Sequence, residues 1–332
     1  MAGRLARGVA LALLLVGVSA WAARAQAGMW TVLATMRVPQ QEGAFEALDG
    51  RIYAVGGFTG LVTEASSLVQ AYDVATDSWS QVASLPEALH HPAAAAVGDR
   101  LYVVGGFYGT FAQREPAQAV WAYDPATDQW ARRASLPTAR GAPAAVALDG
   151  RLYAIGGERR MPGGGPDDYE SVADVAAYDP AADRWETLPP LHHPRNHLAA
   201  AVIDGRIYAV GGRDGTSLLL TDLEEYDPAT GDWRERAAMP TGRSGHAAAA
   251  LAGRLYVFGG EGNTANPRGV FAEVEAYDPA TDSWTLVDTM PTPRHGLGAV
   301  AVGDRIYLPG GSARQGGFGY GRTALLDAYT PD

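Results

Sequence analysis

Short apolar runs recur along the chain at a nearly fixed interval, and each ends in a Gly-Gly pair. The pairs begin at 56, 105, 156, 211, 259 and 310, so successive intervals are 49, 51, 55, 48 and 51 residues. A second apolar run precedes each one across a tight turn such as Asp149-Gly150. Because Asp-Gly suits a turn in which both residues take positive φ, the pattern predicts a β-hairpin in every unit, for example 144–148 with 151–155.

A second hairpin is predicted downstream of each Gly-Gly pair. The segment Tyr-Asp-Pro-Ala-Thr-Asp-x-Trp stands nearly intact at 123–130 and 277–284, with variants at 72–79, 178–185 and 226–233. Pro suits the first central position of a type I turn, and the Asp before it can accept hydrogen bonds from the turn backbone. Each unit therefore contains four predicted strands, with Tyr near the end of the third and Trp near the start of the fourth.

The spacings separate a constant framework from one variable loop. Each Trp precedes the next Gly-Gly pair by 26 residues, and each Tyr precedes its Trp by 7. From Gly-Gly to the following Tyr the distance varies between 15 and 22 residues. All insertions thus fall between strands two and three, on the face that also carries the connections between units. We call this the variable face, and variable loops on a rigid repeat are common binding sites.

The two ends of the repeat complement each other. After the first 27 residues the chain begins with a fourth strand that contains Trp30, and it stops after a third strand that ends near Tyr329. Pairing of these strands would close a ring and remove both sheet edges. Units of about 50 residues with four strands are typical of propeller blades. We therefore predict an all-β fold of six blades, each with four antiparallel strands.

The Gly-Gly, Tyr-Asp and Trp signature over 30–332 resembles that of the kelch-repeat β-propellers. Kelch propellers include adaptors, scaffolds, lectin-like binders and a few enzymes. The resemblance is therefore specific for the fold but not for the function. Two departures fall in the last unit. Pro309 removes a strand donor, and Thr330 replaces the Asp that follows Tyr elsewhere. We interpret both as local loosening of the closing blade.

The first 27 residues have the three parts of a secretory signal. Arg4 and Arg7 precede an apolar run at 9–23, and Ala25-Gln26-Ala27 is a small-x-small cleavage site. The alternative, a membrane anchor, would need about 20 apolar residues. We expect cleavage after Ala27, a single propeller domain over 28–332, and a secreted or periplasmic location.

Charge and composition narrow the chemistry further. The formal net charge is −11, and loss of the signal would make it more negative, so nucleic acid is an unfavourable partner. There is no Cys and no Lys, which excludes thiolate metal sites, Cys nucleophiles and Lys Schiff bases. We expect a monomer with no cofactor and no membrane span after cleavage.

Arg occupies one repeated position in four units. Sixteen residues before each Gly-Gly pair lie Gln40, Leu89, Arg140, Arg195, Arg243 and Arg294. These Arg are either structural ion-pairing residues or a ring of guanidinium groups at the channel mouth that binds an anion. In kelch propellers that capture acidic peptides, matching Arg contact the ligand, so the resemblance implies a ligand-binding role here.

All seven His lie in the connections between units, namely His90, His91, His192, His193, His197, His246 and His295. Adjacent pairs without helical spacing are not diagnostic of metal binding, so no metal site is predicted. We count His197, His246 and His295 among the ligand-binding candidates, with packing against strand starts as the alternative.

The residues that follow the Gly-Gly pairs should also line the variable face. Glu158 and Glu261 are weak candidates for an acid/base pair, and Arg213 is a candidate ligand-binding residue. Phe58, Phe107 and Tyr108 could form a stacking platform for a sugar ring or a peptide. The alternatives are a solvated surface for the glutamates and ordinary packing for the aromatic residues.

Three functions fit these features. The favoured one is an exported binding or scaffolding module for a protein, peptide or glycan ligand. The second is a carbohydrate-active enzyme, such as a sialic acid-like sugar epimerase or mutarotase, in which the Arg ring holds the sugar carboxylate and a Glu moves protons. The third, a metal-dependent oxidase or lyase with His ligands, is least supported.

Overall fold

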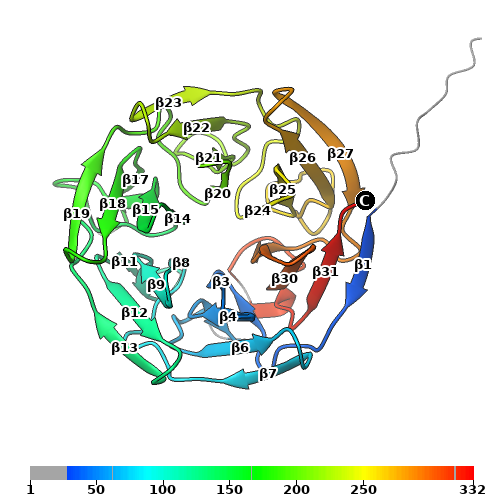
Figure 1. Cartoon of the computed structure of the whole chain (residues 1–332), viewed down its shortest axis with the longest axis horizontal. Helices are drawn as coiled ribbons and strands as arrows, with labels where there is room; N and C mark the ends of the chain where they lie inside the picture. Colours follow the sequence, from blue (N-terminus) through cyan, green and yellow to red (C-terminus); the bar gives the residue numbers. More distant parts are fainter. Residues whose placement is uncertain (1–27, 62, 166, 318) are drawn as a thin grey trace, which may run out of the picture.

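The computed structural model describes residues 28–332 except 62, 166 and 318. The expected signal segment 1–27 lies outside the described residues. Five four-stranded sheets and one five-stranded sheet are arranged radially around a central axis (Figure 1), which confirms the six-bladed propeller. The described part contains no α-helix. It also contains no helix of any kind that is long and apolar enough to cross a membrane.

The blades share one strand order from the axis outwards. In five blades the innermost strands are β3 (Ala44–Leu48), β8 (Ala93–Val97), β14 (Ala144–Leu148), β20 (Ala199–Ile203) and β24 (Ala247–Leu251). The second strands are β4 (Arg51–Val55), β9 (Arg100–Val104), β15 (Arg151–Ile155), β21 (Arg206–Val210) and β25 (Arg254–Phe258). The third strands are β6 (Val69–Asp73), β12 (Val120–Asp124), β18 (Val175–Asp179), β22 (Leu223–Asp227) and β26 (Glu273–Asp278). The outer strands are β7 (Ser78–Gln81), β13 (Gln129–Arg132), β19 (Arg184–Leu188), β23 (Asp232–Glu235) and β27 (Ser283–Thr289).

The sixth blade joins the two ends of the chain. Its strands are β28 (His295–Leu297) with β29 (Val300–Val302), then β30 (Arg305–Ser312), β31 (Leu326–Thr330) and β1 (Met29–Val32). Trp30 pairs with Tyr329 in the β1–β31 register, and their rings lie 4.9 Å apart. The predicted closure by the N-terminal strand is therefore confirmed. Pro309 faces the break between β28 and β29, where the carbonyl of Pro309 accepts from the amide of Gly298 at 3.0 Å.

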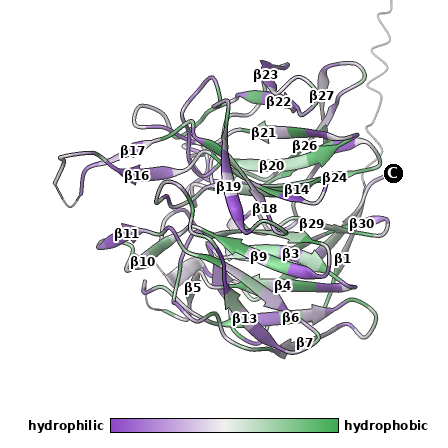
Figure 2. Cartoon of the chain, turned by 60° about the vertical axis from the view of Figure 1, so that its left-hand side comes forward, coloured by the Kyte–Doolittle hydropathy of each residue, from purple (hydrophilic) through white to green (hydrophobic). Residues whose placement is uncertain are grey.

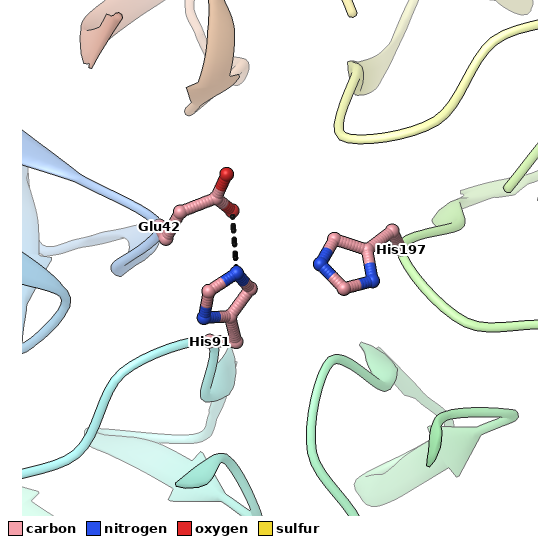
Figure 3. Close-up of side chains that lie close together, drawn as sticks. All are labelled: Glu42, His91 and His197. Carbon is pink, nitrogen blue, oxygen red and sulfur yellow. Dashed lines mark ion pairs between the residues drawn. The ribbon is translucent and has the colours of Figure 1, made fainter. Parts of the chain in front are cut away.

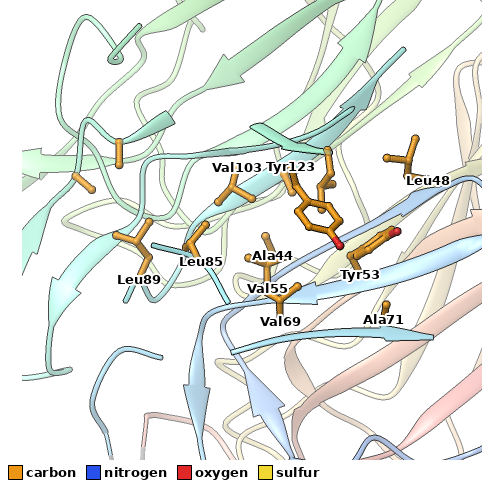
Figure 4. Close-up of a cluster of buried hydrophobic side chains, with 14 residues drawn as sticks. Ala44, Leu48, Tyr53, Val55, Val69, Ala71, Leu85, Leu89, Val103 and Tyr123 are labelled. Atoms are coloured by element: carbon orange, nitrogen blue, oxygen red, sulfur yellow. The ribbon is translucent and has the colours of Figure 1, made fainter. Parts of the chain in front are cut away.

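The hydrophobic core lies between blades. In the described part, six buried clusters each join two neighbouring blades. Figure 4 shows the cluster between the first two blades, where the rings of Tyr53 and Tyr123 lie 5.6 Å apart. Both faces of each blade are buried against neighbouring blades, which is why the inner strands read as apolar runs without regular apolar–polar alternation.

The predicted turn chemistry agrees with the structure. Asp149 and Gly150 both have positive φ, at 50° and 73°. In the second hairpin, Asp124 Oδ1 accepts from the amide of Ala126 at 2.9 Å. These turns join strands that are neighbours in sequence, which is why local patterning located them correctly.

One face carries additional short ribbons. They are β2 (Gln40–Gln41) with β5 (Phe58–Thr59), β10 (Phe107–Gly109) with β11 (Arg114–Pro116), and β16 (Glu158–Arg160) with β17 (Tyr169–Ser171). A single 3-10 turn, η1 (Gly319–Gly321), lies in the corresponding loop of the sixth blade. Figure 2 shows β10–β11 and β16–β17 projecting from the same side of the ring. This side is the variable face.

Candidate functional site

A closed ring of backbone hydrogen bonds encircles the axis on the variable-face side of the inner strands. One residue from each inter-blade connection takes part, and its amide donates to the carbonyl of its counterpart in the preceding blade at 2.7–3.1 Å. All six have φ between 48° and 58°, in the left-handed region. The ring residues are Glu42, His91, Ala142, His197, Gly245 and Gly296.

Three of the six ring residues carry long side chains, and these converge. Glu42, His91 and His197 point toward one another near the axis (Figure 3). Glu42 Oε2 lies 3.3 Å from His91 Nε2, and both side chains are about nine-tenths buried. The remaining ring positions are Gly or Ala, so they leave the centre open. A left-handed backbone favours Gly and disfavours most side chains, so Glu42, His91 and His197 hold long side chains at positions where these are uncommon.

Polar partners fix the orientation of His197. Its Nδ1 lies 2.5 Å from Asn196 Oδ1, while Asn196 Nδ2 donates to Ser171 Oγ at 2.7 Å. This arrangement makes Nδ1 the donor and leaves Nε2 as an acceptor. Arg213 Nη2 donates to Nε2 at 2.9 Å, and Arg213 Nη1 also pairs with Glu261 Oε1 at 2.7 Å.

His295 sits between two carboxylates. Its Nδ1 lies 3.2 Å from Glu42 Oε1 and 3.6 Å from Glu261 Oε2, and the residue is 1% exposed. Its Nε2 lies 2.9 Å from the carbonyl of Arg314, to which it can only donate. Burial by itself lowers the pKa of His295, but Glu42 and Glu261 outweigh it and hold the pKa above its ordinary value.

The other His of this cluster are held neutral. Burial lowers the pKa of His91 well below its usual range, and the positive field of neighbouring His90 adds to the effect. Burial and the guanidinium of Arg213 lower the pKa of His197 in the same way. Neutral imidazoles keep a lone pair available for a ligand.

Cavities lie on both sides of the ring. On the variable-face side, a cavity of about 160 Å³ is lined by Glu42, His91, Phe111, His197, Arg213, Glu261, His295 and 315–317. On the other side, the channel continues between the inner strands as a space of about 300 Å³ lined mostly by Ala. Glu46 is the one charged residue among the described residues that line this second space, and burial raises its pKa to about 7.

The four predicted Arg do not line the channel mouth, which corrects their expected placement. Each is at most 1% exposed and donates to backbone carbonyls of its own blade. Three also form buried ion pairs with an acid on the third strand: Arg195–Glu224, Arg243–Glu275 and Arg294–Asp327. The geometry supports structural ion pairing, and ligand binding by these residues stays a prediction that their burial does not favour.

Arg140 is the exception within this group. It donates to the carbonyls of Gly156 and Asp174 at 3.2 and 2.5 Å, and burial lowers its pKa to about 10. In the first blade, Gln40 takes the equivalent position and donates to the carbonyl of Gly56 at 2.8 Å. These residues hold strands together at the same point in different blades.

The predicted aromatic platform is mostly buried. Phe58 and Phe107 are at most 1% exposed and stack on either side of His90, with ring centroids 4.5 and 5.3 Å from it. Ordinary packing is thus what the structure shows for both. Tyr108 is half-buried and donates to Glu87 at 3.1 Å.

The remaining candidates separate into two groups. Arg213, Glu261, His197 and His295 meet at the axial cavity. Glu158 instead pairs with Arg114 at 3.1 Å and is absent from that cavity's lining, so the two glutamates do not form a shared acid/base pair there. His246 Nε2 donates to the carbonyl of Val210 at 3.1 Å, because a carbonyl oxygen can only accept.

Glu42, His91 and Asn196 belong to this site but were not selected from the sequence. The signal was present: Glu42, His91 and His197 each lie fourteen residues before a Gly-Gly pair. Aligning the units on that position would have placed them in one ring.

Comparison with known proteins agrees with the fold. A family model described as the KLHDC2/KLHL20/DRC7 Kelch-repeats domain matches residues 21–193 and 162–311. The chain belongs to the kelch-repeat family. As a kelch propeller it shares the family's general character of a protein-binding or scaffolding module.

This chain spans less than two thirds of the length of the curated kelch relatives that it matches. Kelch-like protein terF of Aspergillus terreus is 31% identical over 305 residues, which cover 86% of this chain and 64% of that protein. Kelch-like protein 35 of Mus musculus is 28% identical over 194 residues, covering 58% of this chain and 31% of the relative. A solved structure, titled "Structure of YjhT", superposes with a TM-score of 0.71 at 17% identity and covers 90% of this chain and 95% of the other. At that identity the last likeness concerns the fold alone.

Proposed function

We propose that this chain is an exported kelch propeller that binds a protein or peptide partner on its variable face. The observation that carries the proposal is the distribution of exposed apolar side chains. Among the described residues, six large exposed hydrophobic side chains lie on the loops between strands two and three of five blades: Leu61, Phe111, Met161, Leu218, Leu219 and Tyr320. Apolar patches rimmed by polar residues are typical of interaction sites.

Polar and aromatic side chains near this apolar set support a specific contact. A hollow of about 600 Å³ is lined by Tyr108, Arg114, Arg160 and their neighbours. The guanidinium of Arg114 lies 4.3 Å from the ring centre of Tyr169. Tyr and Arg are enriched among the residues that dominate binding energy at protein interfaces.

The chain offers a matched control for this proposal. Met29, Val32 and Leu286 are also large, exposed and apolar, but they lie on the outer strands β1 and β27. Peptides selected against the full chain from a displayed library should bind the triple variant Met29→Ser/Val32→Ser/Leu286→Ser unchanged. They should lose at least about tenfold in affinity for Leu61→Ser/Phe111→Ser/Tyr320→Ser, because that variant removes apolar contact area from the variable face.

Two results would contradict the proposal. One is equal binding by both triple variants, and the other is loss confined to the outer-strand variant. Thermal melting of both variants checks that the fold survives, which is expected because all six side chains are exposed in the native state.

Export is tested separately from binding. Expression in bacteria and N-terminal sequencing of the periplasmic fraction should give a chain that begins at Gly28. Retention of residues 1–27 in that fraction, or an exclusively cytoplasmic product, would overturn the export proposal while leaving the binding proposal intact.

A second candidate is the sugar epimerase or mutarotase. The observation in its favour is that Glu261 lies between Arg213 and His295 at the axial cavity, where a carboxylate, a cation and an imidazole meet. Saturation-transfer NMR on sialic and uronic acids would detect accelerated anomer exchange. Acceleration that disappears in Glu261→Gln would favour this function, and no acceleration with any sugar would exclude it for that panel.

A further inference from the structure

The axial side chains of the kelch ring form an arrangement suited to a metal ion. Glu42, His91 and His197 each offer one ligand atom, and these three atoms lie within 4.8 Å of one another (Figure 3). They come from three different blades, and the closed ring of backbone hydrogen bonds fixes the positions of their Cα atoms. Two imidazoles and a carboxylate are a usual ligand set for divalent transition metals.

The second argument is a buried imidazole nitrogen that faces two carboxylates. Because His295 Nε2 donates to the carbonyl of Arg314 at 2.9 Å, Nδ1 is the nitrogen that faces Glu42 Oε1 at 3.2 Å and Glu261 Oε2 at 3.6 Å. The residue is 1% exposed, so these groups are shielded from water. A cation at this point would meet an imidazole nitrogen and carboxylate oxygens together, which are the donor types of a transition-metal site.

We propose that Glu42, His91 and His197 bind one divalent first-row transition metal ion, with His295 as a fourth ligand. Zn²⁺ fits this set best, since it takes N and O ligands at about 2.0–2.2 Å in tetrahedral geometry. Ligand atoms around such an ion are roughly 3–3.5 Å apart, so side-chain rotations have to close the present separations by about 1 Å.

Two carboxylates offset part of the positive field at this cluster. Glu42 and Glu261 bring two negative charges, Arg213 brings one positive charge, and Arg114 and Arg322 also act on the cluster through His91 and Glu42. Binding of the ion requires Arg213 to release His197 Nε2, yet Arg213 keeps its bonds to Glu261 at 2.7 Å and to Asn196 at 3.2 Å. Asn196 continues to hold His197 through Nδ1, which is the usual outer support of a metal-binding imidazole.

This proposal reverses the expectation from sequence. Adjacent His pairs without helical spacing gave no indication of a site, because the ligands are 49 and 106 residues apart in the chain. Only the ring brings them together. The site does not depend on the proposed protein partner, since it lies on the axis and uses none of the exposed apolar side chains.

The test uses the full chain after treatment with a chelator. Calorimetric titration with Zn²⁺ should give one ion per chain, and Co²⁺ should give the visible d–d absorption of a tetrahedral site. His91→Gln and His197→Gln should each weaken Zn²⁺ binding by more than the roughly 10–100-fold that an outer-sphere residue contributes. The matched control is His192→Gln, because His192 is a half-exposed imidazole that pairs with Glu224 away from the axis. It should bind like the parent chain.

The results divide clearly. No Zn²⁺ binding by the parent chain, or unchanged affinity in both His91→Gln and His197→Gln, overturns the proposal. Loss in His192→Gln equal to that in the axial variants also overturns it, since it would indicate surface binding. If an axial variant does not fold, the Co²⁺ spectrum of the parent decides, and absence of tetrahedral bands counts against the site.

Discussion

At the scale of single residues, buried charge follows a rule that links two strands of each blade. The position two residues before the blade Tyr is acidic in the three blades where a buried Arg has an ion-pair partner: Glu224, Glu275 and Asp327. It is Gln70 opposite Gln40, and Trp121 in the blade that has Leu89. Outside the third blade, a buried Arg therefore occurs only opposite an acid, because an unpaired buried charge is costly. Only Arg140 lacks an acid, and its carbonyl partners and lowered pKa reflect that.

The Arg294–Asp327 pair tests this rule. Arg294→Leu should lower the free energy of unfolding by about 3–5 kcal/mol, because it leaves the Asp327 carboxylate buried without its cation. The double variant Arg294→Leu/Asp327→Leu should recover most of that loss, as expected for replacement of a buried pair by apolar residues. Urea denaturation of Arg294→Leu, Asp327→Leu and the double variant provides the measurement. A double variant as unstable as the sum of the two single variants would contradict the rule.

Glu46 in the Ala-lined channel gives a prediction on pH. Burial raises its pKa from the ordinary 4.5 to about 7, so between these values the unfolded chain loses a proton that the folded chain retains. Stability contributed by this group is therefore complete below pH 4.5 and declines as the pH rises to about 7. At about 1.4 kcal/mol per pH unit, Glu46→Gln should be more stable than the parent by up to about 3 kcal/mol at pH 8. Melting curves at pH 4.5 and 8 should show the difference only at the higher pH.

At the scale of elements, each blade is clamped to the preceding one by its second hairpin. Trp130 Nε1 donates to the carbonyl of Ala83 at 2.8 Å, and Asp128 Oδ1 accepts from the amide of the same Ala83 at 2.8 Å. The same Asp accepts from the hydroxyl of Tyr123 at 2.6 Å. The repeated Tyr, Asp and Trp thus form one inter-blade contact, which explains why their spacing is constant.

The fourth blade shows what the Asp contributes. There the clamp position is Gly231, and the residue it would hold in the preceding blade is Pro189, which has no amide hydrogen to donate. Trp233 Nε1 still donates to the carbonyl of Pro189 at 3.0 Å. The acid is therefore absent where its main backbone partner is absent.

Asp183 in the third blade tests the clamp. Asp183→Gly tolerates the positive φ of this position but leaves the amide of Ala134 and the hydroxyl of Tyr178 without their acceptor. We expect a loss of about 1–2 kcal/mol in unfolding free energy. Asp183→Asn keeps an acceptor oxygen and also tolerates the left-handed backbone, so it should lose clearly less. Equal losses in the two variants would show that the hydrogen bonds do not act as a clamp.

At the scale of the whole molecule, stability depends on closure of the ring. Strand β1 covers the edge of β31, and Figure 1 shows β1 on the outer rim of the ring, outside β31. Trp30 Nε1 donates to Asp288 Oδ2 at 3.0 Å, where the other blades use a backbone carbonyl. The covalent chain does not continue from β31 to β1, so noncovalent contacts alone hold this seam.

Opening the seam should have two measurable effects. Trp30→Ala removes the ring contacts with Tyr329 and Phe258 and should cost about 2–4 kcal/mol. It should also expose the β31 edge and promote association at high concentration, detected by analytical ultracentrifugation. Trp185→Ala is the matched control, because its blade is continuous in sequence. It should lose comparable stability without associating, and equal association of both variants would argue against a special role of the seam.

The sequence by itself determined the number of blades, the order of strands, both turn types and the pairing of Trp30 with Tyr329. These features depend on residues close in sequence, or on the number of repeats, which can be read directly from the chain. Local patterning and spacing are therefore sufficient. Tertiary structure alone decided which side chains at equivalent positions face inwards. Arg195 and Phe58 are buried because neighbouring strands and blades cover them, and that depends on register and inter-blade packing. It also decided that Glu42, His91 and His197 meet, because they occupy one repeated position in three blades and only closure of the ring makes those positions neighbours.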